Sequence, residues 1–272
     1  MNHQIIQPPE ILKRYVRFFW TIDQKSVSNL ESTLKIFACR YPRMVFQHDN
    51  GNSAIKNNDS TMPNAFLSGI NIKPYTAIMS SSFTLTGVSF YPYAIKPLFG
   101  IDMHELCDEF PDLQNFMEPE LCMQILEKST HTEKIDLLIN FLCKRLIKLF
   151  KGNPLDHKIF DLPDIQHQDT SVFYLRKSLK ISERQLERRF KHMVGLSPKQ
   201  YLRVSRFEQA FALIQQRVAS KLGPLAYELN YVDQSHFIKD FKELSGFTPS
   251  ELIKKNKILE DSSSIVFNSE NS

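Results

Sequence analysis

A short amphipathic helix that occurs twice in the chain constrains its fold more than any other feature. In the segment 182–198, three apolar residues recur at a spacing of i, i+4, i+7, which places them on one face of a helix. Ser182 and Gln185 match a capping box at the start of this helix, and Gly195 is a typical residue for its end. The three apolar residues are Leu186, Phe190 and Met193.

The pattern returns 51 positions further along the chain. Phe190-Lys191, Gly195 and Ser197-Pro198 are matched by Phe241-Lys242, Gly246 and Thr248-Pro249. Because the caps, the apolar face and the basic face recur in register, one supersecondary unit used twice is favoured over two unrelated helices of a bundle. A helix from Pro198 to about Arg217, roughly 30 Å long, is expected to join the two units.

Each unit has the pattern of a helix-turn-helix, in which the second helix can lie in the major groove of DNA. The residues predicted to face the bases are Arg184, Glu187 and Arg188 in the first unit and Gln234, Ser235, His236, Ile238 and Lys239 in the second. The residues predicted to contact phosphates are Lys191, Arg203, Arg206 and Lys242. Since the joining helix is close to the ~34 Å rise of one DNA turn, we expect the units to enter two successive major grooves.

Residues 171–256 resemble the DNA-binding domain of the AraC/XylS family of bacterial transcription regulators. The resemblance rests on Ser-x-Arg-x-Leu-x-Arg-x-Phe-Lys at 182–191, Gly-Leu-Ser-Pro at 195–198, Tyr-Leu-Arg-x-x-Arg at 201–206, Asp-Gln-Ser-His-Phe-x-Lys-x-Phe-Lys at 233–242 and Gly-Phe-Thr-Pro at 246–249. It implies a sequence-specific transcription regulator that binds double-stranded DNA through the base-facing positions named above, with RNA polymerase as a further partner.

Three positions depart from the family pattern. Arg176 stands where the first helix of the first unit usually has a small residue, and Lys180 and Asn230 stand where the turns often carry glycine. Asn adopts a positive φ more readily than Lys. The first turn is therefore predicted to be reshaped, and the base contact of Arg184 is less secure than those of the second unit.

The distribution of charge agrees with a DNA-binding C-terminal part. Residues 176–257 carry 17 Lys and Arg against 8 Asp and Glu, whereas the rest of the chain carries 17 against 22. Such asymmetry indicates that one end of the chain binds a polyanion. The chain has no apolar run near the ~20 residues of a membrane span and no signal peptide, so a cytoplasmic location without membrane contact is expected.

Residues 1–150 are predicted to form a β-rich barrel or sandwich followed by helices. Strands are expected at 15–21, 34–39, 44–47, 65–69, 75–80 and 85–90, a loop at 51–61, and helices at 102–110, 118–128 and 133–150. The last helix carries a long apolar stripe of Ile135, Leu138, Ile139, Leu142, Leu146 and Leu149. The stripe either packs against the barrel, which is the favoured interpretation, or pairs two copies in a homodimer.

The sequence thus predicts an α+β protein of two domains. Residues 1–150 are a cupin-like sensor or dimerisation domain, 151–169 a linker, 170–258 the tandem helix-turn-helix domain and 259–272 a disordered tail. The first domain loosely resembles the sensor domains of some family members at 15–20, 87–93 and 98–101, and an unknown small-molecule effector is a candidate partner.

Two other functions remain open. One is an architectural DNA-binding protein without sequence preference, and the other is a cupin-type enzyme joined to a DNA-targeting domain. The enzyme is disfavoured because the chain has no P-loop, GxSxG or HExxH motif and no pair of metal-ligating histidines at i, i+2. The four cysteines, Cys39, Cys107, Cys122 and Cys143, lack metal-binding spacing. No catalytic residue, cofactor or metal is therefore predicted.

Overall fold

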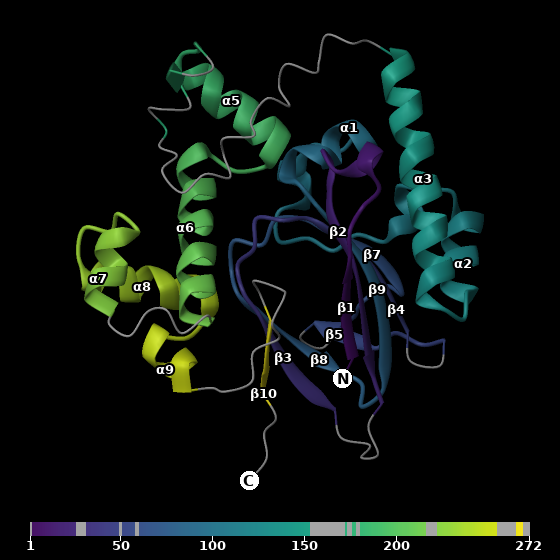
Figure 1. Cartoon of the computed structure of the whole chain (residues 1–272), viewed down its shortest axis with the longest axis horizontal. Helices are drawn as coiled ribbons and strands as arrows, with labels where there is room; N and C mark the ends of the chain where they lie inside the picture. Colours follow the sequence, from purple (N-terminus) through teal and green to yellow (C-terminus); the bar gives the residue numbers. More distant parts are fainter. Residues whose placement is uncertain are drawn as a thin grey trace.

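The computed structural model describes residues 2–25, 31–48, 51–57, 60–152, 172, 176–177, 180–215, 222–254 and 265–268. A β-rich N-terminal part with its own helices lies beside a group of C-terminal helices (Figure 1). The α+β prediction with a helical C-terminal part is confirmed. Most of the predicted linker, residues 153–169, lies outside the described residues.

The strands form two antiparallel sheets of five strands each. The order in the first sheet is β1 (Asn2–Ile6), β2 (Val16–Gln24), β9 (Phe83–Phe90), β4 (Arg43–His48) and β7 (Ala65–Ser68). The order in the second is β10 (Ile265–Asn268), β3 (Ser32–Ile36), β8 (Tyr75–Met79), β5 (Ile55–Asn57) and β6 (Ser60–Thr61). All six predicted strands are present, and β1, β5, β6 and β10 were not predicted.

The central strands of the first sheet, β2, β9 and β4, are largely buried on both faces. One face shares a core with the second sheet, where Trp20, Phe66 and Leu85 pack with Leu34 and Met79. Trp20 lies so close to the backbone of Gly87 that a Cβ there would come within 2.2 Å of the indole ring. Apolar side chains of both sheets therefore pack together between them.

Helices cover the other face of the first sheet (Figure 1). They are the short helices η1 (Glu10–Leu12), η2 (Pro92–Ala94), α1 (Ile95–Phe99), η3 (Met103–Leu106) and η4 (Leu113–Asn115), followed by α2 (Pro119–Glu127) and α3 (His131–Gly152). In α3, Ile135, Leu138, Leu142 and Leu146 are buried, and Ile139 and Leu149 pack half-buried against the same core. The packing interpretation of the stripe is confirmed, and pairing of two copies through it is wrong, because the stripe is already covered.

The C-terminal helices follow the predicted order. They are α5 (Glu183–Val194), α6 (Pro198–Gln215), α7 (Leu222–Glu228), α8 (Gln234–Ser245) and α9 (Pro249–Lys254). Gly223-Pro224 lies in the first turn of α7, a position that tolerates proline because no backbone hydrogen bond is lost. In the described part of the chain, every helix is too short or too polar to span a membrane.

Three further predictions are corrected. The expected helix at 102–110 is reduced to η3, because the backbone of Cys107 is extended, with a φ of −67° and a ψ of 119°, and Asp108 then adopts a positive φ of 59°. The expected loop at 51–61 contains β5 and β6, which extend the second sheet beside β8. The expected disordered tail contains β10, whose Ile-Val-Phe sequence favours a strand and whose backbone pairs with β3.

Candidate nucleic-acid interface

Each helix-turn-helix turn contains one residue with a positive φ and is closed by an equivalent backbone hydrogen bond. Lys180 has a φ of 51° and Asn230 a φ of 57°. In the first turn the N–H of Ile181 donates to the carbonyl of Arg176 at 3.3 Å, and in the second the N–H of Tyr231 donates to that of Ala226 at 3.0 Å. The predicted reshaping of the first turn is therefore wrong, because Lys180 adopts the left-handed conformation that glycine adopts more easily.

The second turn is one residue longer than the first. Ser182, which caps α5, follows Ile181 directly, whereas Val232 lies between Tyr231 and the α8 cap Asp233. Val232 is 87% exposed, so the additional residue projects away from the protein. The repeat of 51 positions therefore holds for the recognition helices, while the turns before them are 50 positions apart.

Helix α5 begins with the predicted capping box. The N–H of Gln185 donates to the Ser182 hydroxyl at 3.3 Å, and the Ser182 N–H donates to the Gln185 side chain at 3.0 Å. Leu186, Phe190 and Val194 form its buried face. The predicted base-facing residues Arg184, Glu187 and Arg188 are all exposed on the other face.

Helix α8 presents a less basic outer face. Asp233 caps it by accepting from the N–H of His236 at 2.7 Å, and Phe237, Phe241 and Leu244 are buried beneath it. Of the predicted base-facing residues, Gln234, Ser235, His236 and Lys239 are exposed. Ile238 is half-buried and packs partly against the core, so less of its side chain is accessible to a ligand.

The residues predicted to contact phosphates fall into two groups. Lys191 and Lys242 are exposed. Arg203 instead forms ion pairs with Asp240 and Glu243 of α8, and the guanidinium of Arg206 lies 4.9 Å from the centre of the Tyr231 ring. Burial and the neighbouring Asp240 carboxylate raise the pKa of the Tyr231 hydroxyl, which donates to Asp240 at 3.0 Å. Arg203 and Arg206 therefore join α6 to the second unit.

Sequence reasoning missed a buried ion pair that joins the two parts of the chain. Arg40 Nε lies 2.7 Å from Glu208 Oε2 on α6, and both side chains are 7% exposed. Arg40 also donates to the Ser205 hydroxyl at 2.7 Å, and Phe37 packs edge-on against Phe207 and Phe211. Their separation of more than 160 positions leaves no local pattern in the sequence that could reveal these pairs.

The first recognition helix also contacts the N-terminal part. A Cβ on Gly195, at the end of α5, would lie 2.6 Å from the carbonyl oxygen of Met103 in η3. Beside this contact, His192 Nδ1 lies 3.7 Å from Asp102 Oδ1. The contacts involve the C-terminal end of α5, which leaves the exposed residues of its N-terminal half available to a ligand.

Two family models match the chain. Residues 175–255 match the model described as a helix-turn-helix domain, and residues 4–112 match a domain of unknown function (DUF6597). Among curated proteins, the uncharacterised HTH-type transcriptional regulator YidL of Escherichia coli (strain K12) is 34% identical over 87 residues. That match covers 32% of this chain and 29% of YidL.

Solved structures are similar over longer stretches at lower identity. ToxT from Vibrio cholerae has a TM-score of 0.41 and 14% identity, with 87% of this chain and 98% of ToxT covered. The C-terminal domain of AraT from Geobacillus stearothermophilus has a TM-score of 0.33 and 23% identity, with 40% of this chain and 92% of that domain covered. The tandem motifs, the paired turns and the matched model together show that residues 175–255 form a helix-turn-helix domain similar to those of the AraC-type transcription regulators.

Proposed function

We propose that this protein is a sequence-specific transcription regulator that binds double-stranded DNA through α5 and α8. The observation that carries the proposal is that both helices are capped alike and bury equivalent apolar faces, while seven of the eight predicted base-facing side chains are exposed. Polar and charged side chains on the outer face of such a helix can read base edges in the major groove.

The arrangement of the helices supports the use of two grooves. Helix α6 has 18 residues and is therefore about 27 Å long. Helices α5 and α8 lie near its opposite ends (Figure 1). Two recognition helices that are separated by nearly one helical turn of DNA can enter successive major grooves on one side of the duplex.

In this proposal Lys191 and Lys242 bind phosphates and set the register of the protein on DNA. Arg203 instead holds α8 in position on α6, and Arg206 contacts the turn before α8 at Tyr231. The N-terminal part binds an effector or a second copy, and regulation follows from how the bound protein recruits or blocks RNA polymerase.

A selection of binding sites from random DNA tests the proposal. The full chain should be used, because Phe37 and Ala38 belong to the same apolar cluster as α6 and α8. Recovery of two short conserved blocks, centred about one helical turn apart, is the expected result. Binding that falls with salt but enriches no sequence would instead support the architectural function.

A further inference from the structure

Two large apolar side chains of the second helix-turn-helix unit are far more exposed than any other in the described part of the chain. They are Tyr227 of α7, which is 86% exposed, and Val232 of the turn, which is 87% exposed. The next most exposed such side chain, Ile11, retains 50%. Tyr227 carries a hydroxyl that water can satisfy, whereas Val232 is purely aliphatic. Because single exposed apolar residues are common on protein surfaces, the position of Val232 decides what it can do.

Val232 is the additional residue of the second turn. It lies between Tyr231 and Asp233, the cap of α8, whereas the cap of α5 follows Ile181 directly. Exposed polar side chains follow it at the start of α8: Gln234, Ser235 and His236. The N-terminal residues of a recognition helix are those that meet base edges in the major groove. Val232 therefore extends the outer surface at this end of α8 by one apolar side chain, and the shorter first turn has no equivalent position.

The backbone on both sides of Val232 is held in place. Before it, the Tyr231 hydroxyl donates to Asp240 of α8 at 3.0 Å. After it, Asp233 accepts from the N–H of His236 at 2.7 Å, and the His236 ring packs edge-on against Tyr231 with 5.4 Å between the ring centres. The β-branched side chain of valine also has few rotamers to lose. A contact between Val232 and a ligand therefore costs little conformational entropy.

An aliphatic side chain in the major groove has one base-specific partner, the C5-methyl group of thymine. The other groups that distinguish the base pairs there are hydrogen-bond donors and acceptors, which a valine side chain cannot pair. The methyl group projects toward the side of the groove nearest its own sugar–phosphate backbone. A residue at the very start of a recognition helix can reach that side of the groove.

We propose that Val232 is a specificity-determining residue that contacts the C5-methyl group of a thymine at one end of the DNA block bound by α8. The inference rests on the proposed function and adds a base preference that the polar side chains of α8 do not supply. It also makes the two units unequal, because only the second turn carries the additional valine.

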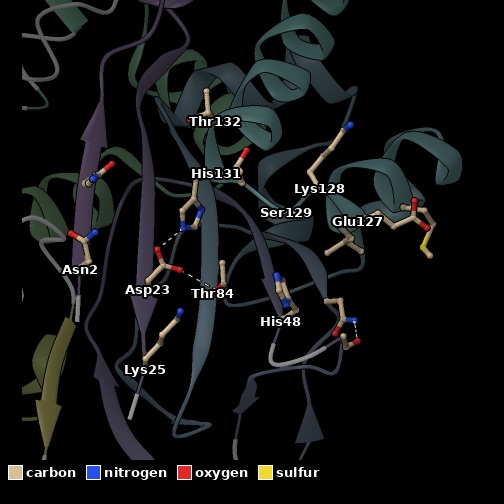
Figure 2. A pocket seen from close by; sticks show the side chains of 16 residues that line it. Asn2, Asp23, Lys25, His48, Thr84, Glu127, Lys128, Ser129, His131 and Thr132 are labelled. Carbon is tan, nitrogen blue, oxygen red and sulfur yellow. Dashed lines mark hydrogen bonds and ion pairs between the residues drawn. The ribbon is translucent and has the colours of Figure 1, made fainter. Parts of the chain in front are cut away.

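The chain offers matched controls for the loss of an exposed apolar side chain. Met123 of α2 is exposed beside a polar cleft that Asp23 and His131 also line (Figure 2). Ile147 is exposed on α3. Both helices lie on the opposite side of the N-terminal part from α8 (Figure 1), so truncation of either side chain removes apolar surface without a change near the recognition helix.

The test takes the site selected from random DNA and replaces each thymine in turn by deoxyuridine, which lacks only the methyl group. The affinity of the full chain for each duplex is measured by fluorescence anisotropy. The wild type is expected to bind about fourfold more weakly when one particular thymine is replaced, as for the loss of one buried methyl group. Val232→Ala should bind the unmodified site about fourfold more weakly and should no longer distinguish thymine from deoxyuridine at that position. Met123→Ala and Ile147→Ala should bind every duplex as the wild type does.

The proposal is overturned if the wild type binds every deoxyuridine duplex as tightly as the thymine duplex, or if Val232→Ala keeps the full discrimination. Loss of discrimination in Ile238→Ala but not in Val232→Ala would assign the methyl contact to the half-buried Ile238 and would also overturn it. In these cases sequence-selective binding persists, so the proposed function stands. If the selection enriches no sequence, the proposed function fails and this inference fails with it.

Discussion

The two helix-turn-helix units have the same local design but different surroundings. Leu186 and Phe190 of α5 belong to the apolar core of the N-terminal helices, whereas Phe237 and Phe241 of α8 belong to a separate core with α6 and α7. The N-terminal part enters that second core through Phe37. The same sequence pattern therefore produces the same kind of capped amphipathic helix in both units. Only in the first unit do the buried residues of that helix pack in the core of the N-terminal helices.

The largest effect is expected at the ion pair between the N-terminal part and α6. Glu208→Ala should lower the free energy of unfolding by about 3–5 kcal/mol, because it leaves the Arg40 guanidinium buried without a counter-charge. Urea unfolding measures this change. The matched control replaces both partners, Arg40→Met with Glu208→Leu, and should recover most of the loss. If the single and double variants are equally unstable, the pair is not the source of the effect.

The caps of α5 and α8 provide the sharpest comparison between the units. Gly195 and Gly246 have nearly equal φ values, 81° and 82°. A Cβ on Gly195 meets the Met103 backbone at 2.6 Å, whereas a Cβ on Gly246 meets the flexible Lys35 side chain at 3.0 Å. Gly195→Ala should therefore cost about 2–4 kcal/mol and Gly246→Ala about 1 kcal/mol in unfolding by urea. If the two variants lose the same free energy of unfolding, the contact of Gly195 with η3 does not contribute to the effect of its substitution.

These comparisons also show what the sequence could predict. The caps, the buried faces and the exposed arginines of α5 follow from local spacing, and so do six strands. The burial of Arg40 against Glu208 and the pairing of Arg203 with Asp240 join distant positions, which no local pattern encodes. The tail strand β10 was missed because its pairing depends on the free edge of β3.

The salt dependence of DNA affinity distinguishes exposed basic residues from those that form ion pairs within the protein. Lys242→Ala should weaken binding to all DNA sequences alike and lower the slope of log affinity against log salt by about 1, because an exposed lysine displaces a counterion when it binds phosphate. Arg203→Ala should leave the slope nearly unchanged, because Asp240 and Glu243 already neutralise its charge. An equal loss of slope in both variants would restore Arg203 as a phosphate contact.

The smallest effect is expected in the turns. Lys180→Gly should raise the free energy of unfolding by about 0.5–1 kcal/mol, because glycine adopts the φ of 51° without the steric cost of a lysine Cβ. Asn230→Gly should change it by less, since Asn tolerates a positive φ. Thermal unfolding of both variants under one set of conditions measures the difference, and a destabilised Lys180→Gly would mean that the lysine side chain stabilises the turn.

The central claim is that α5 and α8 each read a separate part of one DNA site. The most direct measurement is the selection of sites from random DNA, repeated with Arg188→Ala and with Lys239→Ala in the full chain. We expect Arg188→Ala to lose preference in one block and Lys239→Ala in the other, each at a cost of about 1–3 kcal/mol on the wild-type site. If both variants select the wild-type sequence, or both lose the same block, the claim that each helix reads its own groove is wrong.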